Sequence, residues 1–102
     1  MTERISAEDF RRAGGVDDWA VEGESAEAVF RTGSFAAGVA LVERIGILAD
    51  TANHHPDVDL RYPSVAVRLT THDSGGLTDK DVSLARAISE AARKLGVSAE
   101  RV

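Results

Sequence analysis

The feature that most constrains the fold is a segment in which apolar residues recur at steps of three and four, from Ser34 to Asn53. The residues that carry this spacing are Phe35, Val39, Val42, Ile45 and Ala49, with Leu41 and Leu48 widening the stripe. Such a period predicts a long amphipathic helix that packs a broad apolar face on another layer. Ser34 is a suitable N-cap. Pro56 disfavours helical geometry at His55, so the helix must end close to that residue.

Strand patterns occur in pairs before and after this helix. Segments 18–23 and 28–32 predict one hairpin, and segments 58–62 and 64–72 predict a second, with a turn at Pro63 and Ser64. The residues of the last strand that share one face are Val65, Val67, Leu69 and Thr71. His72 lies near the exit of this second hairpin.

Helix signals occur near both ends of the chain. Ser6 and Asp9 have the spacing of a capping box, and the glycines that follow end the predicted helix near residue 13. Thr78 and Asp81 repeat the capping-box spacing before an apolar stripe that continues almost to Gly96. The predicted order is therefore helix, two strands, helix, two strands, helix. We expect an α+β fold in which a four-stranded antiparallel sheet carries three helices on one face.

Length and composition narrow the functional class. A chain of 102 residues is enough for one domain, 1–102, and buries only about two thirds of its unfolded surface, so self-association is expected to cover some apolar area. A net charge of -5 without a basic run disfavours nucleic acids and anionic membranes as partners. The absence of cysteine excludes disulfides and thiolate chemistry. Without a signal core or membrane span, the chain is expected to be cytoplasmic.

Two of the three histidines are adjacent at the predicted end of the long helix. Asp50 and His54 are four residues apart, so they are predicted to share a helix face on which the carboxylate orients the imidazole. His55 precedes Pro56 at the helix exit, and His72 could return to the same corner from the second hairpin. Three groups that titrate near neutral pH suit a reaction that needs an acid and a base together.

Other interpretations of these residues are less favoured. A single histidine here could be a helix cap or a turn residue, and Asp81 could serve only its capping box. Zinc is disfavoured because adjacent histidines rarely chelate one ion and no His-x-His or His-x-x-x-His spacing exists. Gly75-Gly76 lacks the Lys-Ser/Thr of a phosphate loop. The Gly-x-Ser-x-Gly elbow of serine hydrolases is also absent.

The motif residues together resemble the signature of the pterin-4a-carbinolamine dehydratase family. They are Asp50, His54-His55-Pro56, Tyr62, His72, Gly76-Leu77-Thr78 and Asp81. The similarity also includes Trp19, Phe30, Phe35 and the segments 65–72 and 81–85. The resemblance implies an α+β fold with four antiparallel strands and three helices on one side, and assembly into homodimers or homotetramers. It implies a pterin small molecule as the substrate.

The resemblance also implies a reaction, the dehydration of 4a-hydroxytetrahydropterin to quinonoid dihydropterin in tetrahydrobiopterin recycling. This step protonates the C4a hydroxyl and removes a proton from N5. The implied catalytic residues are His54, His55 and His72. Of these, His55 and His72 would be the acid/base pair, whereas His54 would bind and polarise the pterin. The implied substrate-binding residues are Asp50, Asn53, Pro56, Thr71 and Asp81. Neither a metal nor an organic cofactor is implied.

Two other functional classes remain open at this point. Relatives act as dimerisation cofactors of a homeodomain transcription factor, and degenerate members act as assembly chaperones for Rubisco, so a non-catalytic protein-binding role is one alternative. A pterin-binding module without turnover is another. Degenerate members need not keep the site, so the intact histidines of this chain favour the enzyme.

Overall fold

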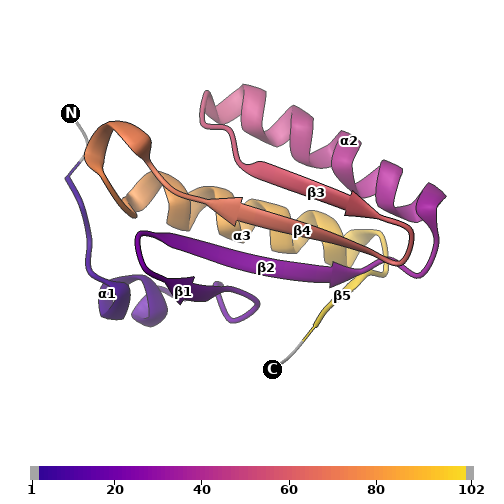
Figure 1. Ribbon diagram of the computed structural model, residues 1–102, viewed down its shortest axis with the longest axis horizontal. Helices are drawn as coiled ribbons and strands as arrows, with labels where there is room; N and C mark the ends of the chain where they lie inside the picture. Colours follow the sequence, from indigo (N-terminus) through magenta and orange to yellow (C-terminus); the bar gives the residue numbers. More distant parts are fainter. Residues whose placement is uncertain (1–2, 101–102) are drawn as a thin grey trace.

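The computed structural model describes residues 3–100, and its elements follow the predicted order (Figure 1). In chain order they are α1 (Ala7–Arg12), β1 (Ala20–Glu22), β2 (Ser25–Arg31), α2 (Phe35–Ala52), β3 (Asp57–Arg61), β4 (Ser64–Leu69), the 3₁₀ helix η1 (His72–Ser74), α3 (Asp79–Lys94) and β5 (Ser98–Ala99). The predicted α+β class and the order of its helices and strands are confirmed. The two-residue strand β5 and the turn η1 are additions to the predicted set.

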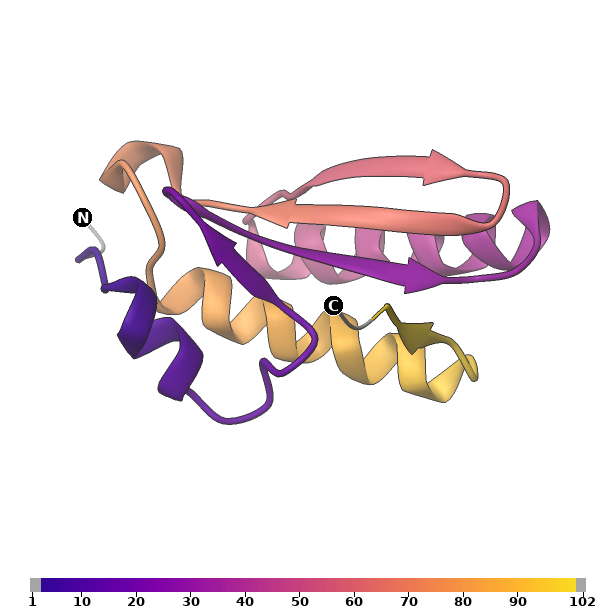
Figure 2. The ribbon, with the colours of Figure 1, turned by 60° about the horizontal axis from the view of Figure 1, so that its bottom comes forward.

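The strands form one antiparallel sheet in the order β1-β2-β4-β3, and β5 also pairs with β2. In the central register, Val67 of β4 lies opposite Ala28 of β2 on one side and Val58 of β3 on the other. Figure 2 shows the helices together on one side of this sheet.

On the edge strand β3, a hydrogen bond from Arg61 lowers the pKa of the Asp59 carboxyl.

The inward face of β4 supplies much of the core. The four residues predicted to share one face are all buried: Val65, Val67 and Leu69 of β4, and Thr71 just beyond it. Trp19, which precedes β1, lies edge-on to Phe30 with 6.1 Å between ring centroids. Its indole N–H donates to the Ser89 hydroxyl on α3 at 3.0 Å, so this buried polar group is satisfied.

The predicted apolar face of α2 is only partly correct. The buried residues of the helix are Gly38, Leu41, Ile45 and Ala49. Phe35 and Val39 are instead 49% and 47% exposed. The cause is a close approach between α2 and β3, since a Cβ at Gly38 would lie 2.6 Å from Cδ1 of Leu60. The helix therefore contacts the sheet through the face that carries Gly38. The side of the apolar stripe that carries Phe35 and Val39 remains exposed to solvent.

The ends of the elements determine where the candidate site residues lie. Ser34 caps α2 by accepting the Ala37 N–H, and both predicted capping boxes, at α1 and α3, are present. The last predicted strand, 64–72, is shorter than expected and ends at Leu69. Thr71 pairs with Gly76 across a tight turn, so His72 belongs to η1 and not to the strand.

Candidate active site

The end of α2 and the start of α3 meet through a histidine–aspartate pair. Asn53 has left-handed backbone geometry (φ 50°) and ends the helix, which sends the next residue toward α3. The His54 Nε2 atom lies 2.6 Å from Asp81 Oδ1. The side chains are 11% and 0% exposed, respectively, so this contact is largely shielded from water.

The second carboxylate oxygen of Asp81 is also occupied. Oδ2 accepts the Thr71 hydroxyl at 2.7 Å and the backbone N–H of Thr78 at 3.0 Å. The Thr71 and Thr78 hydroxyls lie 2.8 Å apart, and all three residues are buried. Asp81 thus caps α3 with one oxygen and contacts His54 with the other. The capping box expected for this residue is therefore present, and the same carboxylate also contacts His54.

The predicted contact between Asp50 and His54 is wrong, because Asp50 contacts the neighbouring histidine instead. Asp50 Oδ1 lies 2.9 Å from His55 Nε2, and both side chains are exposed. The prediction required helical geometry through residue 54. Because α2 ends at Ala52 and Asn53 is left-handed, His54 turns toward α3 and His55 lies over the last helical turn.

His72 begins η1 directly after Thr71, and its side chain is exposed. It borders an open hollow of about 310 Å³ whose other lining residues are Glu24, Ser25, Asp57, Arg68, Thr70 and Gly75. Two contacts from the N-terminal segment hold this turn: Arg4 Nη1 donates to the Gly75 carbonyl at 3.1 Å, and the Ile5 N–H donates to the Leu77 carbonyl at 2.8 Å. Thr71, the residue before His72, contacts the same carboxylate as His54, but neither His54 nor His55 lines this hollow.

The remaining predicted site residues lie at the turn between α2 and β3. Asn53 is exposed, and its backbone N–H donates to the carbonyls of Ala49 and Asp50. Pro56 is half-buried directly before β3. Sequence reasoning missed two contacts: the one between the Thr78 and Thr71 hydroxyls, and the hydrogen bond from Arg4 to the Gly75 carbonyl. The capping-box spacing pointed to Thr78, but no local pattern links Arg4 to a loop more than seventy residues away.

A hollow larger than the one at His72 lies over β1 and β2, with a volume of about 420 Å³. Its charged lining residues are all acidic: Asp17, Asp18, Glu22, Glu27 and Glu100. Its ionisable side chains are carboxylates alone, whereas the corner at the end of α2 carries imidazoles, the side chains most often used for general acid–base catalysis. We therefore place the candidate site at the histidines.

Metal-binding clusters and membrane-spanning helices are both missing from residues 3–100. Within that range, no group of three or more His, Asp or Glu side chains is arranged to hold a metal ion. No helix in the same range has the length and apolar character needed to cross a membrane.

Comparison with known proteins decides the family. The model of the family described as pterin 4 alpha carbinolamine dehydratase matches residues 3–91. The chain belongs to this family. The resemblance proposed from the motif residues is therefore confirmed, as is the prediction of an enzyme of the hydro-lyase class.

Individual members of the pterin 4 alpha carbinolamine dehydratase family align with most of this chain. A relative from Chloroflexus aurantiacus is 49% identical over 73 residues, covering 72% of this chain and 78% of its own length. One from Roseiflexus sp. is 43% identical over 91 residues, covering 88% of this chain and 98% of its own. The names of both refer to this dehydratase.

A solved structure supports the fold. The crystal structure of a transcriptional coactivator/pterin dehydratase from Brucella melitensis matches with a TM-score of 0.80 and 27% identity. The match covers 88% of this chain and 99% of the other.

Proposed function

We propose that this protein dehydrates 4a-hydroxytetrahydropterin to quinonoid dihydropterin by histidine acid/base catalysis, as a step in tetrahydrobiopterin recycling. The observation that carries this proposal is the 2.6 Å contact of His54 with the buried Asp81. Exposed His55 follows His54 in the chain, and exposed His72 follows Thr71, which also contacts Asp81. Family membership supports a pterin as the substrate. The proposal assigns proton transfer to His55 and His72, and assigns binding and polarisation of the pterin to His54.

The reaction needs one proton donor and one proton acceptor. As the C4a–O bond breaks, the donor protonates the hydroxyl oxygen, which leaves as water. The acceptor removes the N5 proton, and the electron pair of the N–H bond forms the new N5=C4a double bond. A protonated imidazole serves as the donor and a neutral one as the acceptor. Because His55 and His72 are exposed, both can recover their starting protonation states by exchange with solvent.

The two carboxylates near the histidines have different environments. Asp81 is fully buried and fixed by several hydrogen bonds, so it holds His54 in one orientation. Asp50 is 81% exposed, and exposed ion pairs contribute little because water and salt screen them. We therefore assign Asp50 a modest role in orienting His55. We assign to Asp81 the role of holding His54 in a fixed orientation.

The test is dehydration of freshly generated 4a-hydroxytetrahydropterin, followed by ultraviolet absorbance. We expect His55→Ala and His72→Ala each to lower the rate by roughly 10²-fold, the usual scale for loss of a general acid or base. Asp73→Asn, an exposed change in the same turn as His72, is the matched control and should keep the wild-type rate. Unchanged rates in both histidine variants would contradict the assignment.

Pterin binding by a wild-type protein that does not accelerate dehydration would favour the module without turnover.

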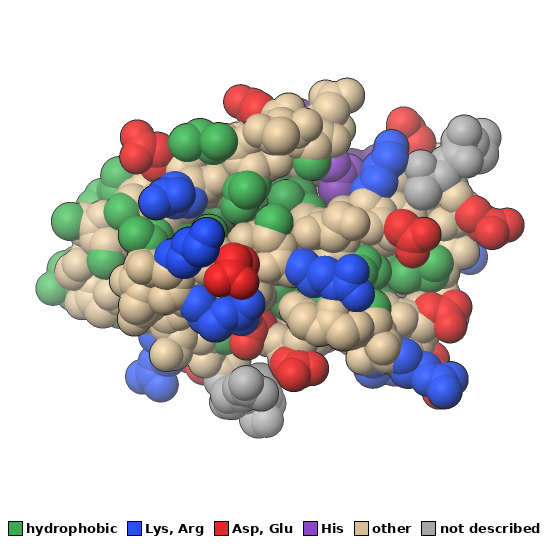
Figure 3. Space-filling model, turned by 180° about the vertical axis from the view of Figure 1, so that it is seen from behind, with side chains coloured by type: hydrophobic (Ala, Val, Ile, Leu, Met, Phe, Trp, Pro, Cys, Tyr) green, Lys and Arg blue, Asp and Glu red, His purple; other side chains and the backbone are tan. Residues whose placement is uncertain are grey.

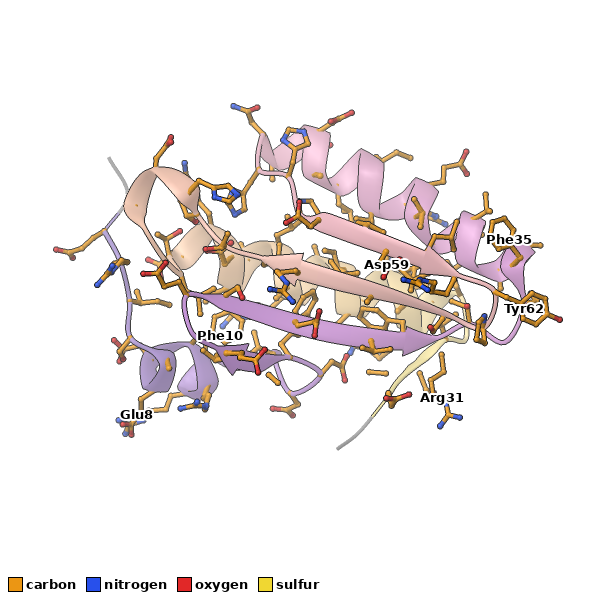
Figure 4. The ribbon with its side chains drawn as sticks, viewed as in Figure 1. Glu8, Phe10, Arg31, Phe35, Asp59 and Tyr62 are labelled. Carbon is orange, nitrogen blue, oxygen red and sulfur yellow. The ribbon has the colours of Figure 1, made fainter. Side chains whose placement is uncertain are left out.

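We also propose that the protein self-associates as a homodimer or homotetramer. Apolar side chains of the described residues remain exposed on α2 and β3 and in the turn after β3, at fractions from 37% to 68%: Phe35, Val39, Ile47, Val58 and Tyr62. Figure 3 shows hydrophobic side chains gathered toward one end of the back face of the molecule. Figure 4 places Phe35 and Tyr62 together at one end, away from α1. Burying such a surface against a second copy is favourable.

A protein-binding role is the second candidate function. The same apolar surface could receive a different protein, and the Brucella melitensis protein is described as a transcriptional coactivator as well as a pterin dehydratase. Dehydratase activity that is lost in His55→Ala and His72→Ala would establish the enzyme. Wild-type protein that neither binds pterin nor accelerates dehydration would favour the protein-binding role.

A further inference from the structure

We propose that Thr71, Thr78 and Asp81 act as positioning residues that set the tautomer of His54, with the proton on Nε2 and Nδ1 free to accept. The inference deepens the proposed function, because it states what His54 can offer a substrate. It rests on the hydrogen bonds around one buried carboxylate. Its test is a spectrum of the protein without pterin, so it can fail or succeed independently of the dehydration assay.

The proton of each hydroxyl can be assigned from the donors that surround it. Thr71 donates its only hydroxyl proton to Asp81 Oδ2 at 2.7 Å. In its 2.8 Å contact with Thr78, Thr71 must therefore accept, and Thr78 must donate. The Thr78 oxygen in turn accepts the backbone N–H of Lys80 at 3.2 Å. Every hydroxyl in this chain of contacts thus has a defined direction.

These contacts also fix the orientation of the carboxylate. Oδ2 receives the Thr71 hydroxyl and the backbone N–H of Thr78, and a backbone N–H can only donate. Asp81 is 0% exposed, and turning it away would leave these buried donors unpaired, which is unfavourable. Oδ1 is therefore held toward His54 as an acceptor.

The consequence for His54 follows from the chemistry of imidazole. Neutral imidazole carries one proton, so a ring whose Nε2 donates to a carboxylate presents Nδ1 as the acceptor. The network thereby presents a proton-accepting nitrogen, not a second N–H, to a ligand of His54. Thr71 and Asp81, which the family resemblance assigned to substrate binding, contribute through His54, since their polar atoms are used inside the protein.

The test is a long-range ¹H–¹⁵N spectrum of the histidine rings in ¹⁵N-labelled protein, at a pH where His54 is neutral. We expect the wild-type ring in the Nε2–H form. In Asp81→Asn, the Thr71 hydroxyl and the Thr78 N–H require the amide oxygen at the position of Oδ2, so the NH₂ group faces His54. Because NH₂ donates, Nε2 must accept, and the ring should change to the Nδ1–H form. A wild-type Nδ1–H ring, or a folded Asp81→Asn protein that keeps Nε2–H, would overturn the inference.

A second pair of variants separates positioning from general stability. Thr71→Ser keeps the hydroxyl, whereas Thr71→Val keeps the shape and removes it. With dehydratase activity present, we expect Thr71→Val to lower kcat several-fold with little change in KM, and Thr71→Ser to restore kcat. Equal kcat values in the two variants would contradict a positioning role for this hydroxyl. An inactive wild type with an Nε2–H ring would instead contradict the proposed function and leave the inference intact.

Discussion

At the scale of single residues, Asn53 decides which histidine meets which carboxylate. Its φ of 50° and ψ of 44° lie in the left-handed region, which asparagine tolerates better than most residues. The turn it makes directs His54 to Asp81 and leaves His55 beside Asp50. The family resemblance assigned Asn53 to substrate binding, whereas the structure gives its backbone a role as the C-cap of α2.

We predict that Asn53→Ala lowers the free energy of unfolding by about 1 kcal/mol, because alanine is strained in left-handed geometry. Asn53→Gly should be as stable as the wild type, since glycine adopts this geometry without strain. Urea unfolding followed by circular dichroism measures both. The same two proteins test the binding role, because both lack the amide side chain. Activity lost equally in the Gly and Ala variants would show that the side chain, and not the turn, is needed.

At the scale of elements, the sequence carried strong local information about the helices and strands. Capping residues such as Ser34 and Thr78, and the alternation in β4, placed most elements within a few residues. Contacts between elements were harder to predict, because they depend on where each helix ends and how it rolls on the sheet. The Asp50–His54 error arose from one left-handed residue. The exposure of Phe35 arose from the close approach at Gly38.

Two glycines of α2 test this packing as a matched pair. A Cβ at Gly46 has no neighbouring atom within 4 Å, so Gly46→Ala should raise the free energy of unfolding by about 1 kcal/mol through helix propensity. Gly38→Ala has the same propensity gain but must displace Leu60, and overpacking typically costs about 1–3 kcal/mol. We therefore expect Gly38→Ala to be the less stable variant in urea unfolding. Equal stability would mean that α2 does not approach β3 this closely.

At the scale of the whole molecule, the exposed apolar residues extend from the start of α2 to the neighbourhood of the histidine site. Ile47, at 60% exposure, borders a groove between α2 and α3 whose apolar floor includes Leu48 and Ala91. Phe35 and Tyr62 lie at the end where α2 begins and β3 turns into β4 (Figure 4). His54 and His55 lie just after α2, and exposed Val58 follows three residues later in β3. Self-association through the end that carries Phe35 and Tyr62 would leave the turn after α2 free for a ligand.

We predict that Ile47→Glu shifts the protein toward monomer, because it places a charge in an apolar contact with a second copy. Sedimentation velocity over a range of concentrations measures the assembly. Arg11→Glu, an exposed change on α1, is the control and should leave the assembly as in the wild type. An Ile47→Glu protein that assembles like the wild type would place the interface elsewhere.

The most direct test of the central claim is the dehydration rate of freshly generated 4a-hydroxytetrahydropterin with wild-type protein and with the His55→Ala/His72→Ala double variant. Circular dichroism of the double variant establishes that the fold is kept. We predict that wild type accelerates the reaction and that the double variant loses this acceleration by roughly 10²-fold or more. Equal acceleration by the two proteins would contradict histidine acid/base catalysis at this site.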